Sequence, residues 1–268
     1  MKINLHKDFK FLKIIFDAFL LRRVWWFTSL ARTEARFSRT TLGSFWLGIS
    51  NLLSISLLSL VYGTVFKIEN FKEYVVYLGI GLSLWNCLSS SISSAPNLLI
   101  QNSIKIKNTN INIIFYPCEE WAFQIQNFLQ SFFLVFFVLI FFEKSRILNF
   151  IFFSILPLIN FFIFMFWFPL AISILGVKFR DLYQLIPILL QLTFLLSPIL
   201  YIKENLGNLI WIANLNPIYL IISNLRDSII EGKISLVNIT LILILNLIGF
   251  SISIIYLNKE KSKIPFLL

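Results

Sequence analysis

The chain has 268 residues, of which 58% are hydrophobic and 13% charged, and its mean hydropathy is +0.83. This composition is typical of an integral membrane protein with little soluble mass. The net charge of +10 raises the possibility of nucleic-acid binding, but the distribution of the charge along the chain, given below, excludes that role. Two cysteines and one histidine have no metal-binding spacing, so we expect neither a metal nor a cofactor.

Residues 1–39 are predicted to form a cytoplasmic amphipathic segment before the first membrane span. At about 100° per residue, Arg32, Arg36 and Arg39 lie on one side of a helix, roughly opposite Trp26. A basic stripe opposite aromatic residues is typical of a helix in the membrane interface, in contact with anionic membrane lipids. Two roles stay open for this segment. It either anchors the chain at the membrane by positive charge alone, or it also contacts a cytoplasmic partner.

Six stretches without Asp, Glu, Lys, Arg or His predict an all-α integral membrane protein with six transmembrane helices. Each stretch reaches the ~20 residues that a helix needs to cross the hydrocarbon core. Their continuous apolar character indicates helices, because the strands of membrane barrels alternate in polarity. The predicted membrane domain covers residues 40–257, with spans at about 42–66, 74–98, 121–142, 150–175, 183–202 and 236–257.

A seventh apolar stretch, residues 208–225, is interrupted by Asn214, Asn216 and Pro217. A continuous lipid-facing helix there would carry polar and helix-breaking residues in mid-membrane. We therefore expect a re-entrant hairpin that enters and leaves on the outer face, before the last span.

The basic residues predict the orientation. With six spans and the N-terminus inside, 16 of the 23 Lys and Arg residues lie on the cytoplasmic side, including those of a basic tail at 258–268. This positive-inside bias predicts that both termini are cytoplasmic. It also accounts for the net charge without a nucleic-acid partner.

The spans hold no ionisable group of the kind on which proton- and ion-coupled carriers depend. The chain also has no phosphate-binding loop, since its one Gly-Lys pair, Gly232-Lys233, is followed by isoleucine. We therefore expect a transporter subunit rather than an enzyme, driven by a separate ATPase.

Several short motifs occur in a fixed order relative to the spans. They are Leu42-Gly43 with Trp46, Tyr74 with Trp85, Tyr116-Pro117, Phe179-Arg180-Asp181, Ser197-Pro198, Asn216-Pro217, and Arg226 with Gly232. In this order the chain resembles, from about residue 25 to 257, the permease subunits of type-2 ABC exporters for polysaccharides such as O-antigen, capsule and teichoic acid. It departs from that family at Asn51, where proline is common, and near Asn112 and Cys118, where Lys and Arg are usual.

The resemblance implies a homodimer of permeases with two ATP-binding-cassette ATPase subunits in a bacterial inner membrane. The permease dimer would enclose a channel for a lipid-linked glycan, including lipopolysaccharide precursors such as the O-antigen.

Three cytoplasmic elements are candidates for coupling to the ATPase: the Arg32–Arg39 helix, a short coupling helix in residues 104–120, and residues 178–181. Their candidate residues are Arg32, Arg36, Arg39, Glu119, Glu120, Arg180 and Asp181. Simpler interpretations stay open, because acidic residues favour a helix N-terminus and Arg180-Asp181 suits a local ion pair.

Trp46, Tyr62 and Trp85 are candidates for an aromatic channel lining, since they lie in the spans that also hold Ser and Asn. Close helix packing is the simpler interpretation of such small hydroxyl residues. Two other functions remain: a type-2 permease for a small drug or lipid, and a membrane-embedded transferase. A transferase would need positioned acids, bases or metal ligands, and the predicted membrane segments contain neither histidine nor a carboxylate.

Overall fold

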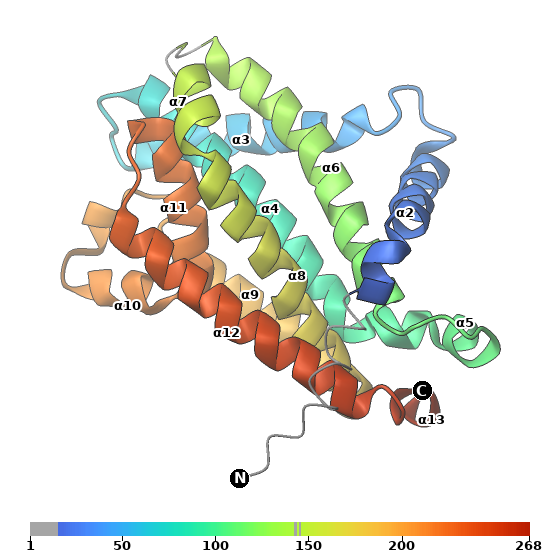
Figure 1. Cartoon of the computed structure of the whole chain (residues 1–268). Helices are drawn as coiled ribbons and strands as arrows, with labels where there is room; N and C mark the ends of the chain where they lie inside the picture. The colour runs from blue at the N-terminus through green and yellow to red at the C-terminus, as the bar shows by residue number, and fades with distance from the viewer. Residues whose placement is uncertain (1–15, 142–143, 145) are drawn as a thin grey trace.

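The computed structural model describes residues 16–141, 144 and 146–268. The first 15 residues of the predicted amphipathic segment, and residue 142 at the end of the third predicted span, lie outside the described residues. All regular elements of the described part are helices, as predicted for an all-α membrane protein (Figure 1). Their bounds are α2 Arg22–Phe37, α3 Phe45–Val65, α4 Phe71–Gln101, α5 Ser103–Asn108, α6 Phe115–Ile140, α7 Arg146–Phe153, α8 Ile155–Lys178, α9 Leu182–Leu196, η1 Lys203–Leu209, α10 Ile210–Leu215, α11 Pro217–Glu231, α12 Leu236–Glu260 and α13 Ile264–Leu267.

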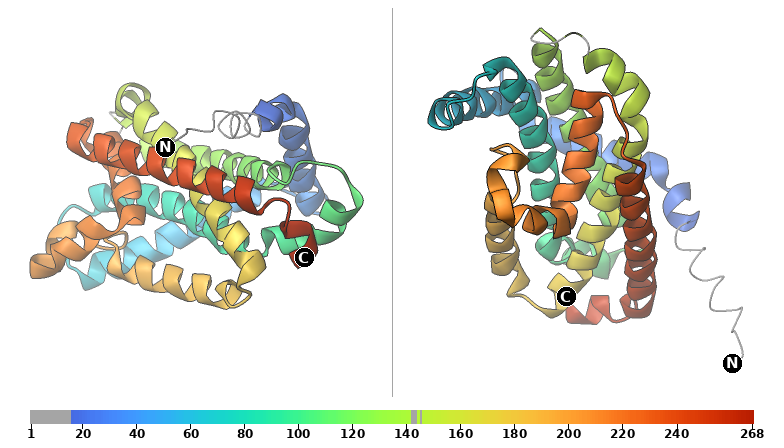
Figure 2. Two further views of the ribbon diagram at one scale, coloured as in Figure 1. Left: turned by 60° about the horizontal axis from the view of Figure 1, so that its bottom comes forward. Right: turned by 90° about the vertical axis from the view of Figure 1, so that its left-hand side faces the viewer.

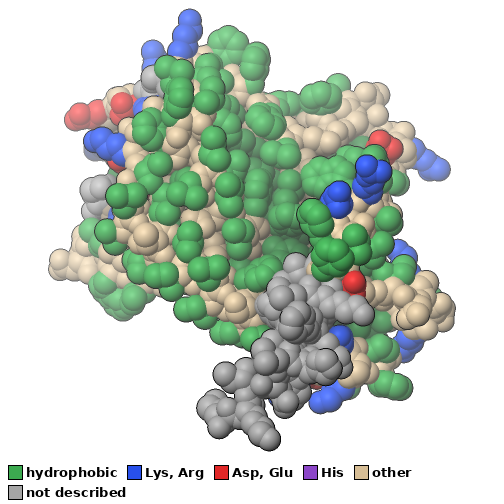
Figure 3. All heavy atoms as spheres, viewed as in Figure 1, with side chains coloured by type: hydrophobic (Ala, Val, Ile, Leu, Met, Phe, Trp, Pro, Cys, Tyr) green, Lys and Arg blue, Asp and Glu red, His purple; other side chains and the backbone are tan. Residues whose placement is uncertain are grey.

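Five of these helices, α3, α4, α6, α8 and α12, are long and apolar enough to cross a membrane, and the number is six if the bent pair Asn205–Leu215 and Pro217–Glu231 is counted as one span. The bundle has two ends. At the Asn70 end α4 and α12 begin, and at the Glu120 end α4, α8 and α12 finish close to the start of α6. Hydrophobic side chains cover the face formed by α8 and α12, and Lys and Arg lie toward its edges (Figure 3). This distribution is typical of a bundle surrounded by lipid.

Helix α4 is the central helix of the bundle. It packs against α3, α6, α8, α9 and α11, and 78% of its apolar stretch is buried, against 17% for α3 (Figures 1 and 2). The side chain of Asn70 caps its first turn by accepting a hydrogen bond from the Glu73 amide. Gly176 of α8 allows a close backbone approach to α4, because a Cβ there would lie 2.2 Å from the carbonyl oxygen of Pro96.

The fifth predicted span, 183–202, is only partly helical. Helix α9 has 15 residues and ends at Leu196, because Pro198 favours extended backbone at Ser197 and removes a donor. Two of the carbonyl groups that follow face α4, because the Tyr77 hydroxyl lies within hydrogen-bond distance of the carbonyls of Pro198 (2.9 Å) and Tyr201 (3.2 Å) and shares its one proton between them. Non-helical backbone is tolerated at membrane depth when protein covers it in this way.

The predicted break at Asn216-Pro217 is a sharp bend, where the helical segment Asn205–Leu215 meets α11 at 109°. The Asn216 side chain caps α11 through the amides of Ile218 and Tyr219 and donates to the Ser197 hydroxyl. At its other end, α11 contacts α7, where Asn149 donates to the carbonyls of Ile229 and Ile230. A bend of this size fits a broken span as well as a re-entrant hairpin, so the hairpin stays a prediction.

Three local features differ from the prediction. Helix α2 ends at Phe37, so Arg39 lies in the following turn and does not extend the basic stripe; the chain reverses there through Gly43, whose φ is +57°. The predicted coupling helix over 104–120 is only the six-residue α5, because α6 begins at Phe115 and includes Glu119 and Glu120. A separate helix, α7, precedes α8 and is divided from it at Ser154.

Candidate functional site

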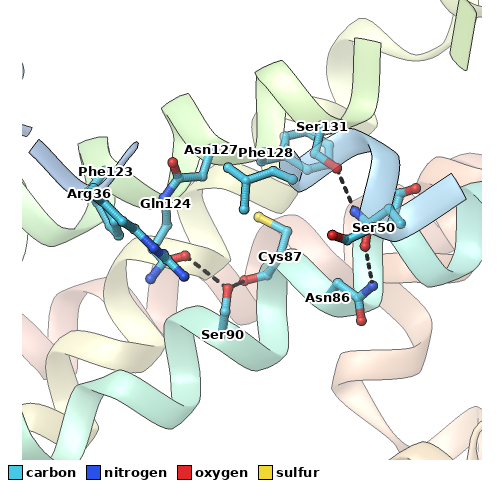
Figure 4. Close-up of a pocket in the computed structure, with 13 residues that line it drawn as sticks. Arg36, Ser50, Asn86, Cys87, Ser90, Phe123, Gln124, Asn127, Phe128 and Ser131 are labelled. Atoms are coloured by element: carbon cyan, nitrogen blue, oxygen red, sulfur yellow. Dashed lines mark hydrogen bonds between the residues drawn. The ribbon is translucent and has the colours of Figure 1, made fainter. Parts of the chain in front are cut away.

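A polar cavity of about 270 Å³ lies between the end of α2 and the helices α3, α4 and α6. Arg36 and Gln124 lie at one end of it and Ser50, Asn86 and Ser131 at the other (Figure 4). The full lining is Arg36, Leu47, Ser50, Asn51, Ser83, Asn86, Cys87, Ser90, Phe123, Gln124, Asn127, Phe128 and Ser131. Most of these side chains carry an amide or a hydroxyl group, so the cavity offers many neutral hydrogen-bonding groups inside an apolar bundle.

Asn51 links the three helices that form one side of the cavity. Its side-chain nitrogen donates to the Ser131 hydroxyl of α6, and its oxygen accepts a hydrogen bond from Asn86 of α4 at 2.9 Å. The exposed Asn86 retains the acceptor capacity of its own side-chain oxygen. Asn51 also lies within the single regular helix α3, where it serves as a polar link.

A chain of hydrogen bonds leads from the cavity to the Glu120 end of the bundle. Ser90 donates to Gln124 at 2.9 Å, and Gln124 donates to the buried Glu120 carboxylate at 2.8 Å. Ser94 donates to the same carboxylate oxygen at 3.0 Å. The other oxygen of Glu120 forms an ion pair with Arg32 of α2 at 2.6 Å. Buried charge of this kind is stable only when paired and hydrogen-bonded, and here α2 supplies the partner.

A groove of about 520 Å³ lies between α2 and the segment 105–119. Its walls include Val24, Thr28, Ala31, Thr109, Ile111, Phe115 and Tyr116. Arg32, Lys105 and Glu119 supply its charged groups. The groove therefore combines apolar walls with both signs of charge, a combination typical of a contact surface for another protein.

The other predicted coupling residues lie apart from this groove. Arg36 lines the polar cavity and lies 5.4 Å from the Phe37 ring centre. Arg180 and Asp181 are both exposed in the turn between α8 and α9. The predicted local ion pair between them does not form among the described residues; at this end of the bundle Lys178 pairs with Glu260 instead, at 3.0 Å.

The three predicted channel aromatics lie at different heights and do not meet. Trp46 is 41% exposed in the first turn of α3, and Tyr62 stacks on Phe66 near the end of that helix, 5.7 Å between ring centres. Trp85 is only 6% exposed and packs against Phe194 of α9 at 5.2 Å. Within one copy of the chain, Trp85 therefore has a packing role, whereas Trp46 has a free face.

Comparison with known families decides which kind of protein carries this site. The family model described as ABC-2 type transporter matches residues 29–230. The chain belongs to the ABC-2 type transporter family. A search of the curated proteins finds no match. An ABC-2 permease is the membrane subunit of an ABC exporter, which implies an ABC ATPase as its partner.

The matched region of this ABC-2 permease contains the polar cavity and, apart from Val24 and Thr28, the groove beside α2. Sequence reasoning did not identify the cavity, because its residues come from four helices and carry no common spacing. It also assigned no role to Arg226, which is 2% exposed in α11 and donates to the Pro198 carbonyl at 3.0 Å. The available signal was an arginine directly after the apolar stretch 208–225.

Proposed function

We propose that this ABC-2 permease forms the channel of an exporter that moves a lipid-linked polysaccharide, such as an O-antigen precursor, across the bacterial inner membrane. The observation that carries the proposal is the polar cavity of about 270 Å³ between α2, α3, α4 and α6. A sugar chain presents a high density of neutral hydroxyl groups. Removing these hydroxyl groups from water is costly unless groups along the transport path replace the hydrogen bonds that the hydroxyls made to water.

The chemistry of the cavity suits such a substrate. Asn51, Asn86, Gln124 and Asn127 can both donate and accept, and serine hydroxyls between them can do the same. Arg36 supplies the one ionised side chain of the lining. An apolar drug would gain little from these groups, and a cavity for it is expected to be mainly hydrophobic and aromatic.

The groove between α2 and the segment 105–119 is the proposed docking site of the ATP-binding-cassette subunit. Glu119, Arg32 and Lys105 supply its charged groups. Arg180 and Asp181, exposed after the end of α8, and Arg39, exposed in the turn after α2, would make further contacts with the ATPase outside the groove. The Arg32–Glu120 ion pair would then pass movement from α2 to α6. Arg36 would connect the end of α2 to the transport cavity.

The orientation and the dimer are also part of the proposal. Helices α2 and α13 both lie at the Glu120 end of the bundle, as both termini would on one cytoplasmic side (Figure 1). Helix α3 leaves large apolar side chains such as Leu53, Leu57 and Leu60 exposed. A second copy that covers α3 and α9 would close the cavity into a channel, with Trp46, Tyr62 and Trp85 near its wall.

Gene deletion in the source bacterium tests this proposal. Loss of the permease should leave lipid-linked glycan inside the cell and remove it from the surface, measured by sugar analysis of the two fractions. Complementation with Asn86→Leu should restore less surface glycan than Asn86→Gln at equal membrane abundance. Normal surface glycan in the deletion strain would contradict the proposal.

A second candidate function is export of a small drug or lipid. It is favoured by an apolar cavity of about 260 Å³ between the start of α2 and the helices α6, α8 and α12, lined by residues such as Trp25, Trp121, Phe166 and Phe250. For this function, Trp121→Ala should alter drug resistance while Asn86→Leu does not. The polysaccharide proposal predicts that Asn86→Leu reduces glycan export while Trp121→Ala does not.

A further inference from the structure

Residues 261–268, here the α13 segment, fold back onto the Glu120 end of the bundle. Lys263 donates its amide to the Glu260 carbonyl at 2.8 Å, and the Leu268 amide donates to the Ile264 carbonyl at 3.1 Å. Ile264 is 1% exposed, whereas Phe266, two residues on, is 91% exposed. The segment therefore buries one specific side chain rather than its whole apolar surface.

Ile264 enters a buried cluster that is built from several helix ends. The cluster includes Leu99 of α4, Ile106 of α5, Ile113 of the following loop and Val177 of α8. Helix α13 contacts both α5 and α8. The α13 segment therefore joins the end of α8 to the loop between α4 and α6, two parts of the chain that are far apart in sequence.

An ion pair fixes the start of the segment. The buried Glu260 carboxylate lies 3.0 Å from the Lys178 ammonium of α8, and its other oxygen lies 3.8 Å from Lys263. The Lys178 ammonium also lies 5.1 Å from the centre of the Tyr256 ring. These contacts hold the last turn of α12 against α8 and so direct residues 261–268 toward α5.

Helix α5 needs such support, because six residues are too few for a helix that is stable by itself. Ile106 is its one buried side chain, while Lys105 and Lys107 are exposed on either side. Without Ile264, the cluster around Ile106 would lose one of its walls.

We propose that the α13 segment braces α5, and that Ile264 is the positioning residue of this brace. The inference rests on the proposed function in one respect: the braced loop leads into the groove where the ATP-binding-cassette subunit docks. A fixed loop passes the movement of that subunit into α4 and α8, whereas a loose loop absorbs it. The brace itself is a property of the permease alone.

Hydrogen–deuterium exchange of the full-length permease in lipid nanodiscs tests the brace. In α5 the Ile106 amide bonds to the Asn102 carbonyl and the Thr109 amide to the Lys105 carbonyl, both at 2.9 Å. Ile264→Asp should speed exchange of peptides that cover these amides by about tenfold or more, because local protection depends on the apolar surface that Ile264 buries against α5. Ile264→Leu should restore protection, and Phe266→Ala should leave it unchanged.

Peptides from α4 report whether the bundle stays folded in each variant. If Ile264→Asp loses protection there too, Ile264→Ala takes its place, and exchange must then rise in α5 alone. Unchanged exchange in α5 for a folded Ile264 variant would overturn the brace.

A second measurement separates the brace from the proposed function. It uses the ATP-binding-cassette subunit that supports glycan export with the unaltered permease. Ile264→Asp should lower the ATP hydrolysis stimulated by the permease several-fold, whereas Phe266→Ala should not. Equal stimulation in both variants would overturn the coupling role. Failure of the unaltered permease to bind any such subunit would overturn the proposed function. The exchange result tests the brace by itself in either case.

Discussion

The guanidinium carbon of Arg226 lies 3.8 Å from the centre of the Tyr77 ring, and both side chains donate to the Pro198 carbonyl. One arginine thereby joins α11 to α4 and to the segment that follows α9. Its ion-pair partner, Asp227, is 46% exposed at the side chain and contributes little by comparison. Of the contacts that Arg226 makes, those with Tyr77 and Pro198 are therefore the ones that join these three elements.

Arg226→Met should destabilise the permease, since it removes a buried hydrogen bond and a desolvated cation–π contact. We expect a loss of roughly 2–3 kcal/mol, measured as a lower midpoint of thermal unfolding in detergent. Tyr77→Phe, which retains the ring, should cost about 1 kcal/mol. Asp227→Asn is the matched control and should cost less than about 1 kcal/mol; an equal loss in Asp227→Asn would contradict this assignment.

The two neighbouring glutamates at the start of α6 should behave differently. Glu120→Lys places a positive charge against Arg32 inside the bundle, so it should unfold or strongly destabilise the permease, by about 3 kcal/mol or more. Glu119→Lys changes the groove beside α2 and should weaken copurification of the ATP-binding-cassette subunit while the unfolding midpoint stays close to normal. Normal copurification of a folded Glu119→Lys permease would remove Glu119 from the docking surface.

Helix α8 should not tolerate a side chain at Gly176. A Cβ there would lie 2.2 Å from the Pro96 carbonyl oxygen and 2.7 Å from its Cα, both backbone atoms that cannot rotate away. Gly176→Ala should therefore force α4 and α8 apart and lower folded yield, at a cost of about 1–3 kcal/mol or more. Gly81→Ala is the control, because its nearest neighbour would lie at an ordinary 3.6 Å. Equal stability of the two variants would show that the helices can move apart freely.

The sequence predicts the membrane elements well because their signal is local. Charge-free stretches indicate the helices, and Asn216-Pro217 indicates the bend, since each follows from a property of a few adjacent residues. Pro198 also indicates that α9 ends near Leu196. The prediction placed the end later, because the apolar stretch continues to residue 202. The break between α7 and α8 at Ser154 has no comparable local signal.

The candidate site is harder to predict because it depends on contacts between distant residues. Arg32 and Glu120 are 88 residues apart in the chain and form one ion pair. Their separate patterns, a basic stripe and an acidic helix start, indicate two solvent-facing groups instead. Likewise Asn51 and Asn86 become a single polar surface only when α3 packs on α4. No periodicity within either helix carries that information.

The orientation can be tested by labelling cysteines from outside the cell. Asn205→Cys and Lys263→Cys are both placed at exposed positions, on either side of α12. In a background with Cys87→Ala and Cys118→Ala, an impermeant maleimide should label Asn205→Cys in intact cells and Lys263→Cys only after permeabilisation. Labelling of Lys263→Cys in intact cells would contradict the predicted cytoplasmic position of residues 258–268.

The aromatic residues can separate channel lining from packing, because Trp46 and Trp85 differ in exposure. Trp85 is 6% exposed against Phe194, so Trp85→Ala should leave a cavity and cost about 3–5 kcal/mol, while Trp85→Phe should cost less. Trp46 is 41% exposed, so Trp46→Ala should leave the unfolding midpoint nearly unchanged. If Trp46 stacks on sugar rings in a dimeric channel, that variant should still reduce surface glycan at normal membrane abundance, and Trp46→Phe should recover most of it. Full export by Trp46→Ala would exclude Trp46 from the channel lining.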